Sequence, residues 1–332
     1  MNADAEEEGL IRVELKDVVK ETTHWLELFD DEFELVNMPF YRRPLQAAMR
    51  LVQVGIKDVP GHTKDDYLMT PWFSEIVKQV IGWYEERYGA EALQPEQSRF
   101  SGVVLLRRTP IRLTMRETVK RVEVENETSW MIYADAIHES ETVLSFFSSK
   151  PNLDALPAQD RTKLEADVAR VVSQSRRINL ALHSADDLEP DGQRLRDGVW
   201  LHVENAVVNI ASLKPSLASV GAWELHLAVE KAFKVFLHQH GNTDMKALGH
   251  DLYKMSGAAK EFGLVVNPKA LAKMPHWRAA SDSRYAQKAV DIDDVVAIYD
   301  IALQLMSEIT AKMKRIVVLN NAGILLRKPD WV

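Results

Sequence analysis

One arginine and one histidine have a spacing that could support cleavage of RNA. Five residues separate Arg177 from His183, and Arg176 directly precedes Arg177. The histidine could act as a general acid or base while the arginine binds the scissile phosphate, without any metal ion. The alternative is structural, because positive side chains near the C-terminal end of a helix interact favourably with its dipole. A metal-independent ribonuclease that uses Arg177 and His183 is therefore one hypothesis.

A second set of residues could contact phosphate through charge alone. The densest basic stretch of the chain contains Arg107, Arg108, Arg112, Arg116, Lys120 and Arg121. On a strand, Arg112 and Arg116 would share one face and could lie along a nucleic-acid backbone. Charged side chains on solvent-facing strands also discourage unwanted edge pairing. This patch is either a nucleic-acid contact or a solvated sheet surface.

The most informative stretch lies between residues 223 and 285. It begins with apolar residues at helical spacing and includes Glu230-Lys231-Ala232-Phe233-Lys234, in which Glu230 precedes Lys234 by four positions, a favourable surface pairing. A glycine at position 241, the sequence His250-Asp251-Leu252 and the pair Arg284-Tyr285 follow. This order of motifs resembles the HEPN domain. The resemblance implies a C-terminal helical bundle that either cuts RNA or binds nucleotides and partners without catalysis.

The resemblance also bears on which branch of the family applies. HEPN ribonucleases place an arginine four to six positions before a histidine on one helix. Within this segment no histidine follows Arg278, Arg284 or Arg315, so the resemblance implies the non-catalytic branch. It further implies a homodimer in a prokaryotic defence or toxin–antitoxin setting, with a nucleotide or RNA as ligand. The residues that would form the ligand site are Lys234, His250, Arg278, Arg284 and Tyr285.

The same residues also have a structural interpretation. Asp251 could simply cap a helix, and Arg284 could pair with a nearby aspartate. A third hypothesis is therefore a protein-interaction scaffold with a purely structural bundle. It predicts no nucleotide binding and unchanged behaviour on Arg278→Ala or Arg284→Ala.

Composition excludes several classes of site. The chain has no cysteine, so disulfides and thiolate zinc sites are absent. His226 and Glu230 are four positions apart, but two ligands do not make a metal site. We therefore expect no metal and no cofactor. No apolar run approaches the roughly 20 residues needed to span a bilayer, and the acidic first nine residues lack the features of a secretory signal. These features predict a cytoplasmic protein without a membrane partner.

Charge is unevenly distributed over the 332 residues, whose net charge is −8. From residue 220 onward, 15 Lys and Arg stand against 12 Asp and Glu, a net charge of +3. The preceding part has 26 against 37, a net charge of −11. Neither part has the strongly basic character typical of a broad nucleic-acid platform.

Periodicity divides the chain into three regions that would position these residues. Apolar spacing predicts helices over about 15–29, 44–57 and 71–88. Short alternating segments between 99 and 149, the last at 143–147, predict an antiparallel sheet of four or five strands. Helices return at about 164–182, 200–213, 223–237 and 252–262, with a last helix from 291 to about 318. The glycine-containing, acidic stretch 184–198 is expected to be a boundary.

The predicted fold class is α+β and predominantly α-helical. N-terminal helices and a small antiparallel sheet are expected within residues 1–150. A long helix and linker follow at 151–198, then a HEPN-like helical bundle at 199–320 and a C-terminal tail at 321–332.

Overall fold

The computed structural model describes residues 18–57, 66–94, 99–186, 188–242, 245–278 and 290–328. It is mainly helical with a small antiparallel sheet region, which confirms the predicted fold class. The chain forms two compact units. The first comprises residues 1–97, 124–128 and 327–332, and the second comprises residues 98–123 and 129–326. All the candidate site residues that the structure describes belong to the second unit.

The first unit is built from helices, as predicted. Its elements are α1 (Val18–Glu21), α2 (Thr23–Leu35), the 3₁₀ turn η2 (Phe40–Arg42), α3 (Arg43–Arg50), the π-helical turn η3 (Leu51–Gly55), α4 (Pro71–Tyr88) and η4 (Ala90–Leu93). Helix α4 has the bounds that the sequence predicts. The Thr70 side chain accepts a hydrogen bond from the Phe73 amide, and Gly89 terminates the helix with a φ of 82°. Phe73 and Tyr84 of α4 are fully buried in the core of this unit.

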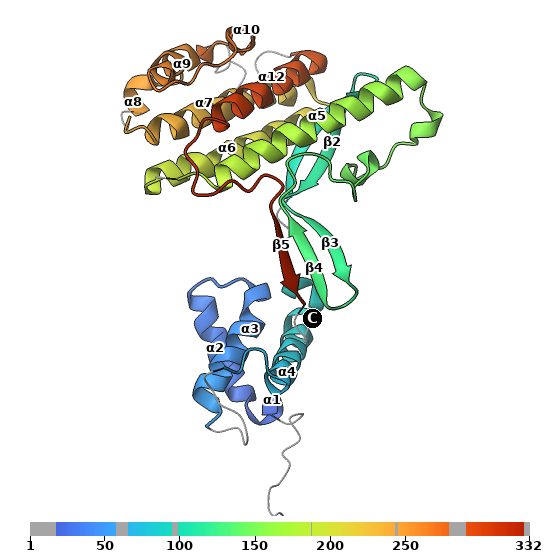
Figure 1. Cartoon of the computed structure of the whole chain (residues 1–332), viewed down its shortest axis with the longest axis vertical. Coiled ribbons are helices and arrows are strands. Elements are labelled where there is room, and N and C mark those ends of the chain that lie inside the picture. Colours follow the sequence, from blue (N-terminus) through green and yellow to red (C-terminus); the bar gives the residue numbers. More distant parts are fainter. Residues whose placement is uncertain are drawn as a thin grey trace, which may run out of the picture. The chain divides into compact units, whose positions relative to one another are not determined.

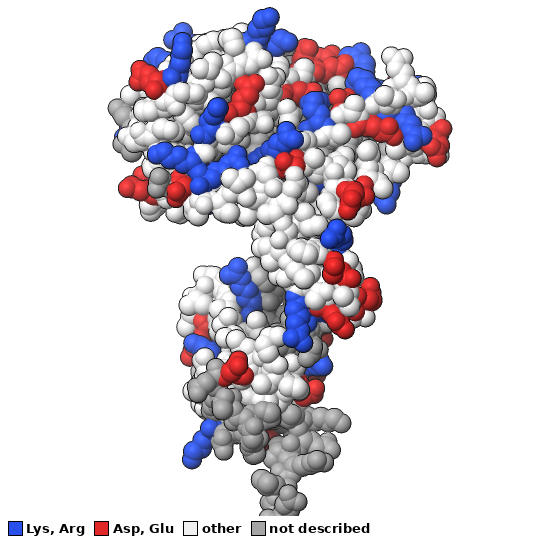
Figure 2. All heavy atoms as spheres, in the orientation of Figure 1, with Lys and Arg blue, Asp and Glu red and all other residues white. Residues whose placement is uncertain are grey.

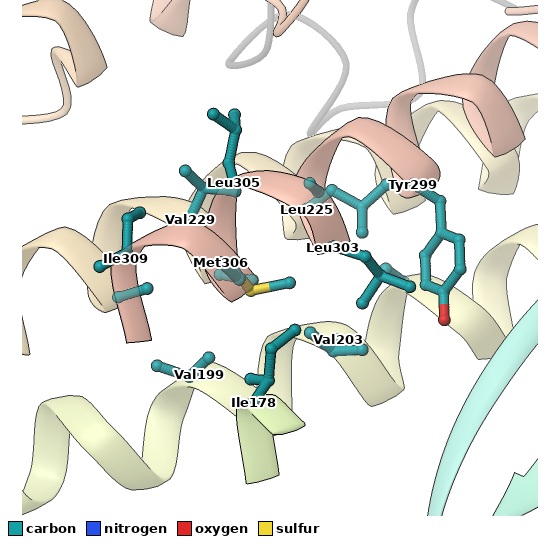
Figure 3. Packing of buried hydrophobic residues seen from close by; sticks show 14 of the residues in the cluster. Ile178, Val199, Val203, Leu225, Val229, Tyr299, Leu303, Leu305, Met306 and Ile309 are labelled. Atoms are coloured by element: carbon teal, nitrogen blue, oxygen red, sulfur yellow. The ribbon is translucent and has the colours of Figure 1, made fainter. Parts of the chain in front are cut away.

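Four long helices form the core of the second unit (Figure 1). They are α5 (Ala158–His183), α6 (Pro190–Ala211), α7 (Pro215–His238) and α12 (Ile292–Thr310). Their apolar stripes meet in one core, which Figure 3 shows at close range. Ile178 of α5, Val203 of α6, Val229 of α7 and Met306 of α12 are each fully buried there. The short helices α8 (Met245–Leu248), α9 (Leu252–Lys260) and α10 (Pro268–Leu271) lie between α7 and α12 in sequence.

The expected boundary at 184–198 is mostly helix, because α6 already begins at Pro190. The glycines that suggested a linker instead allow α6 to approach α7 closely. A Cβ atom at Gly198 would lie 2.3 Å from Lys231 Nζ, and one at Gly192 would lie 3.0 Å from His238 Nδ1. Glycine in this stretch therefore reflects helix packing, which local sequence cannot distinguish from a turn.

The strands form two small sheets rather than the single sheet that was expected. One pairs β1 (Arg99–Leu106) with β2 (Thr109–Arg116), and the other has the order β3–β4–β5, with β3 at Val119–Val124, β4 at Thr128–Ile132 and β5 at Gly323–Arg327. The apolar segment 143–147 is not a strand, because Val143–Phe146 forms the 3₁₀ turn η5. A second turn, η6 (Leu153–Ala155), precedes α5. Helix α12 ends at Thr310 rather than near residue 318.

The predicted boundary at residue 150 does not coincide with the division between the compact units. Strand β1 packs against α5 and α6, so the β1–β2 hairpin belongs with the helical bundle. Gly102 makes this close approach feasible, since a Cβ atom there would lie 2.7 Å from Val171 Cγ1 of α5. Residues 323–327, expected within a C-terminal tail, form β5 beside β4.

Among the described residues, no helix combines the length and the apolar character needed to cross a lipid bilayer.

Candidate functional sites

A buried carboxylate organises the segment that resembles the HEPN domain. Glu230 of α7 is only 4% exposed. Its carboxylate accepts a hydrogen bond from Lys234 Nζ at 2.6 Å and lies 2.8 Å from His250 Nδ1. A buried carboxylate requires such partners, because an unpaired charge away from water is strongly unfavourable. Two of the predicted ligand residues therefore converge on Glu230, which the sequence indicated only as part of a surface pair.

His226 lies one helical turn before Glu230 and is also buried. Its Nδ1 is 3.1 Å from the Pro275 carbonyl oxygen, and its Nε2 is 3.0 Å from that of His250. The ring is nearly parallel to that of Trp223, at an angle of 5° and a centroid distance of 6.0 Å. Burial lowers the pKa of His226, an effect opposed by the carbonyls and by Glu230. We refer to His226, Glu230, Lys234 and His250 as the Glu230 cluster.

The position of His250 is fixed by the start of α9. Asp251 caps this helix, since its Oδ1 accepts hydrogen bonds from the amides of Tyr253 at 2.9 Å and Lys254 at 3.2 Å. The structural interpretation of Asp251 as a capping residue thus agrees with the geometry. Because His250 precedes the cap directly, its contact with Glu230 ties the first turn of α9 to α7.

Of the three remaining predicted ligand residues, one has no hydrogen bond or ion pair with this cluster and two fall outside the described residues. Arg278 is exposed, and its guanidinium lies 5.2 Å from the centre of the Trp277 ring. Arg284 and Tyr285 fall outside the described residues. A recess beside His226 is lined by residues that include Asp251 and Trp277, but its volume of about 10 Å³ is far below the size of a ligand pocket.

The structure separates Arg177 and His183 on α5. Six positions along an α-helix correspond to a rotation that leaves two side chains about 120° apart. Arg177 Nε lies 3.8 Å from Asp135 Oδ2, whereas His183 Nδ1 lies 3.9 Å from Glu117 Oε1. Each side chain is more than half exposed. Within one chain, the two residues therefore face different surroundings.

His183 lies in a pocket with residues other than Arg177. The pocket has a volume of about 350 Å³, and its lining includes Glu117, Arg196 and Asp197. Arg196 Nε donates a hydrogen bond to the adjacent Asp197 carboxylate at 2.9 Å. Sequence spacing could not reveal this neighbourhood, because it combines α5, α6 and the turn after β2.

Arg176 is a buried structural residue rather than part of the exposed end of α5. Its side chain is 1% exposed and forms two hydrogen bonds to Glu141, each of 2.7 Å. It also donates to the Ala136 carbonyl and lies over the Phe146 ring. This arginine fixes the segment between β4 and η5 against α5.

Acidic partners accompany four of the six predicted nucleic-acid residues. The pairs are Arg107 with Asp160 at 2.8 Å, Arg108 with Asp291 and Asp293, Arg112 with Glu204 at 3.5 Å, and Arg121 with Glu123 and Glu139. The β1–β2 register also places Arg107 and Arg108 at the opposite end of the hairpin from Arg116. On the face seen in Figure 2, acidic and basic side chains are interspersed over the second unit. Arg116 and Lys120 differ from the other four, because they line a pocket together with Arg99.

In the part of the chain that the structure describes, no three His, Asp or Glu side chains are grouped in a way that could hold a metal ion.

Comparisons with protein-family models, with curated proteins and with solved structures find no match to this chain. The resemblance to the HEPN domain therefore rests on the order of its motifs.

Proposed function

We propose that this protein is a non-catalytic HEPN-like protein that acts by binding and self-association. The observation that carries the proposal is the buried Glu230 carboxylate between Lys234 and His250. In the segment that resembles the family, these groups neutralise one another and join α7 to α9. Because breaking a buried ion pair is strongly destabilising, charged side chains used in this way hold the helices together and are poorly placed to activate a substrate.

The positions of Arg177 and His183 support the same proposal. A ribonuclease needs its histidine and arginine to reach one phosphate group, within hydrogen-bond distance of the reacting atoms. These two side chains project in different directions from α5 and contact different carboxylates. As part of the proposal, the protein is a homodimer whose ligand is a nucleotide or RNA, in a prokaryotic defence or toxin–antitoxin setting. That part follows from the family resemblance alone.

An RNA-cleavage assay tests the non-catalytic part of the proposal. Purified protein, Arg177→Ala and His183→Ala would each be incubated with mixed-sequence RNA in the presence of EDTA. We expect no cleavage that distinguishes the unmodified protein from the two variants. Cleavage that both substitutions abolish would overturn the proposal and establish a metal-independent ribonuclease.

Light scattering coupled to size-exclusion chromatography tests the self-association. We expect a particle with twice the mass of one chain at micromolar concentration. A monomer throughout the accessible concentration range would contradict the homodimer. The protein would then be better described by the scaffold hypothesis if it also failed to bind nucleotides.

A further inference from the structure

A pocket lies where the open end of the β1–β2 hairpin meets the segment around η5. Its volume is about 410 Å³. Three cationic side chains line it, namely Arg99 of β1, Arg116 of β2 and Lys120 of β3. The strand register places Arg99 directly opposite Arg116, so both project from the same face of the hairpin. We call this site the Arg116 pocket.

Hydroxyl groups supply most of the remaining polar lining. They belong to Thr114, Thr118, Ser140, Ser145 and Ser148. The Ser145 hydroxyl donates to the Thr142 carbonyl at 2.6 Å, and the Ser140 hydroxyl lies 2.8 Å from His138 Nδ1. Among the described residues, the other three hydroxyls have no hydrogen-bond partner, which leaves them available to donate to a bound group.

The acidic residue of the lining is already neutralised from behind. Glu141 accepts two hydrogen bonds from the buried Arg176 guanidinium and one from the His138 amide at 3.0 Å. By contrast, no ion pair or hydrogen bond joins the Arg116 or Lys120 side chain to another described residue. Two of the three cations that line the pocket therefore have no acidic partner among the described residues.

Edge protection does not account for Arg116 on β2. The side of β2 near Leu113 is already covered, because Leu113 forms a bridge with Phe147. An anion bound in the pocket would supply a partner for the Arg116 and Lys120 side chains, which have none among the described residues.

We propose that the Arg116 pocket binds the phosphate group of a small phosphorylated ligand. The guanidinium groups of Arg99 and Arg116 match the geometry of phosphate oxygens, and Lys120 adds a compact positive charge. The hydroxyls of Thr114 and Thr118 donate further hydrogen bonds. The volume of about 410 Å³ falls in the range of small-molecule sites, so it accommodates a phosphorylated molecule beyond the phosphate itself. This inference is independent of the HEPN resemblance, since the pocket lies outside the segment that carries it.

Calorimetric titration of the full chain tests the proposal. The probes are inorganic phosphate, AMP and adenosine at constant, low ionic strength. We expect binding of AMP and none of adenosine. Equal affinities for AMP and inorganic phosphate would identify a site for the free ion, whereas tighter binding of AMP would identify a phosphate ester as the ligand.

Charge-neutral variants locate the binding site. Arg116→Gln and Lys120→Gln should each weaken AMP binding, for Arg116→Gln by about tenfold or more, as expected for loss of a charge-assisted contact. Arg107→Gln is the matched control, because it removes the same charge from an exposed arginine that pairs with Asp160 outside the pocket. Its affinity for AMP should equal that of the unmodified protein.

Several outcomes would overturn the proposal. They are absence of phosphate and AMP binding at millimolar concentration, binding of adenosine as tight as that of AMP, and unchanged affinity in both pocket variants. An equal loss of affinity in Arg107→Gln would show that general charge attraction, not the pocket, holds the anion. Binding of single-stranded RNA without binding of either small anion would replace the small ligand by a nucleic acid.

Discussion

The Glu230 cluster and the Arg116 pocket belong to the same compact unit but treat charge in opposite ways. In the cluster, a carboxylate that is 4% exposed lies between a lysine and a histidine of the same chain. In the pocket, three cations surround a carboxylate that a fourth, buried cation already neutralises. The charges of the cluster are paired within the chain, whereas Arg116 and Lys120 in the pocket have no acidic partner among the described residues.

The helices around the cluster and the strands around the pocket are consistent with this difference in charge pairing. The cluster joins one long helix to the start of a short one, so its contacts fix helix packing. The pocket is formed by strand ends and turns, where binding residues are commonly found because a rigid scaffold positions them at the surface. Charge that the protein compensates internally stabilises the fold, and charge that it leaves uncompensated is available for recognition.

The largest expected effect is on the free energy of unfolding when Glu230 of the cluster is replaced. Glu230→Ala should lower the free energy of unfolding by about 3 kcal/mol, because it leaves the Lys234 side chain, which is only 12% exposed, without its carboxylate partner. Urea denaturation measures this change. Glu261→Ala, at an exposed position just after α9, is the control and should change stability by less than about 0.5 kcal/mol. If Glu230→Ala lowered the free energy of unfolding by less than about 1 kcal/mol, the paired charges of the cluster would not be important for stability, and the contrast with the pocket would fail.

A second prediction concerns the pH dependence of the cluster. Burial lowers the pKa of His226 below the usual value of about 6.5, so the unfolded chain binds this proton more readily than the native protein. The contribution of His226 to stability is fully present above about pH 6.5 and is lost as the pH falls through its native pKa. His226→Gln removes the titrating group.

Urea denaturation at several pH values between about 7.5 and 5 would test this expectation. The stability of the unmodified protein should decline more steeply on acidification than that of His226→Gln, by on the order of 1 kcal/mol. The same slope in both proteins would show that His226 does not contribute to the acid sensitivity.

The smallest expected effect is on the free energy of unfolding when Arg116 of the pocket is replaced. This substitution should stabilise the protein, whereas the substitution of Glu230 should destabilise it. Without ligand, Arg116→Gln should raise the free energy of unfolding by about 0.5 kcal/mol, because it removes a like charge directly opposite Arg99. Added salt should reduce this gain by screening the repulsion. Arg112→Gln on the same strand is the control and should give no gain, since Arg112 hydrogen-bonds Ser101 and lies beside Glu204.

Chemical denaturation at low and high salt measures both variants. A lower stability of Arg116→Gln in the absence of ligand would mean that Arg116 has a structural partner. The comparison between a compensated cluster and an uncompensated pocket would then fail.

Local sequence determined much of the secondary structure. Thr70 and Gly89 delimit α4, Asp251 caps α9 and Asp291 caps α12, because these signals act within one helical turn. Apolar periodicity also indicated the long helices and hence the predominantly helical α+β class. The segment 143–147 was assigned wrongly, because a short apolar run does not distinguish a strand from a 3₁₀ turn.

The candidate sites depended on contacts between residues distant in sequence. The spacing of Glu230 and Lys234 predicted an ion pair, but only the packing of α7 against its neighbours buries it and adds His250. Arg99 lies outside the basic stretch that the sequence indicated, yet strand pairing places it opposite Arg116. Sequence determined which residues share a helix or strand face, because that depends on local backbone geometry. Tertiary structure decided which charges are buried, paired or left uncompensated, because that depends on which faces meet.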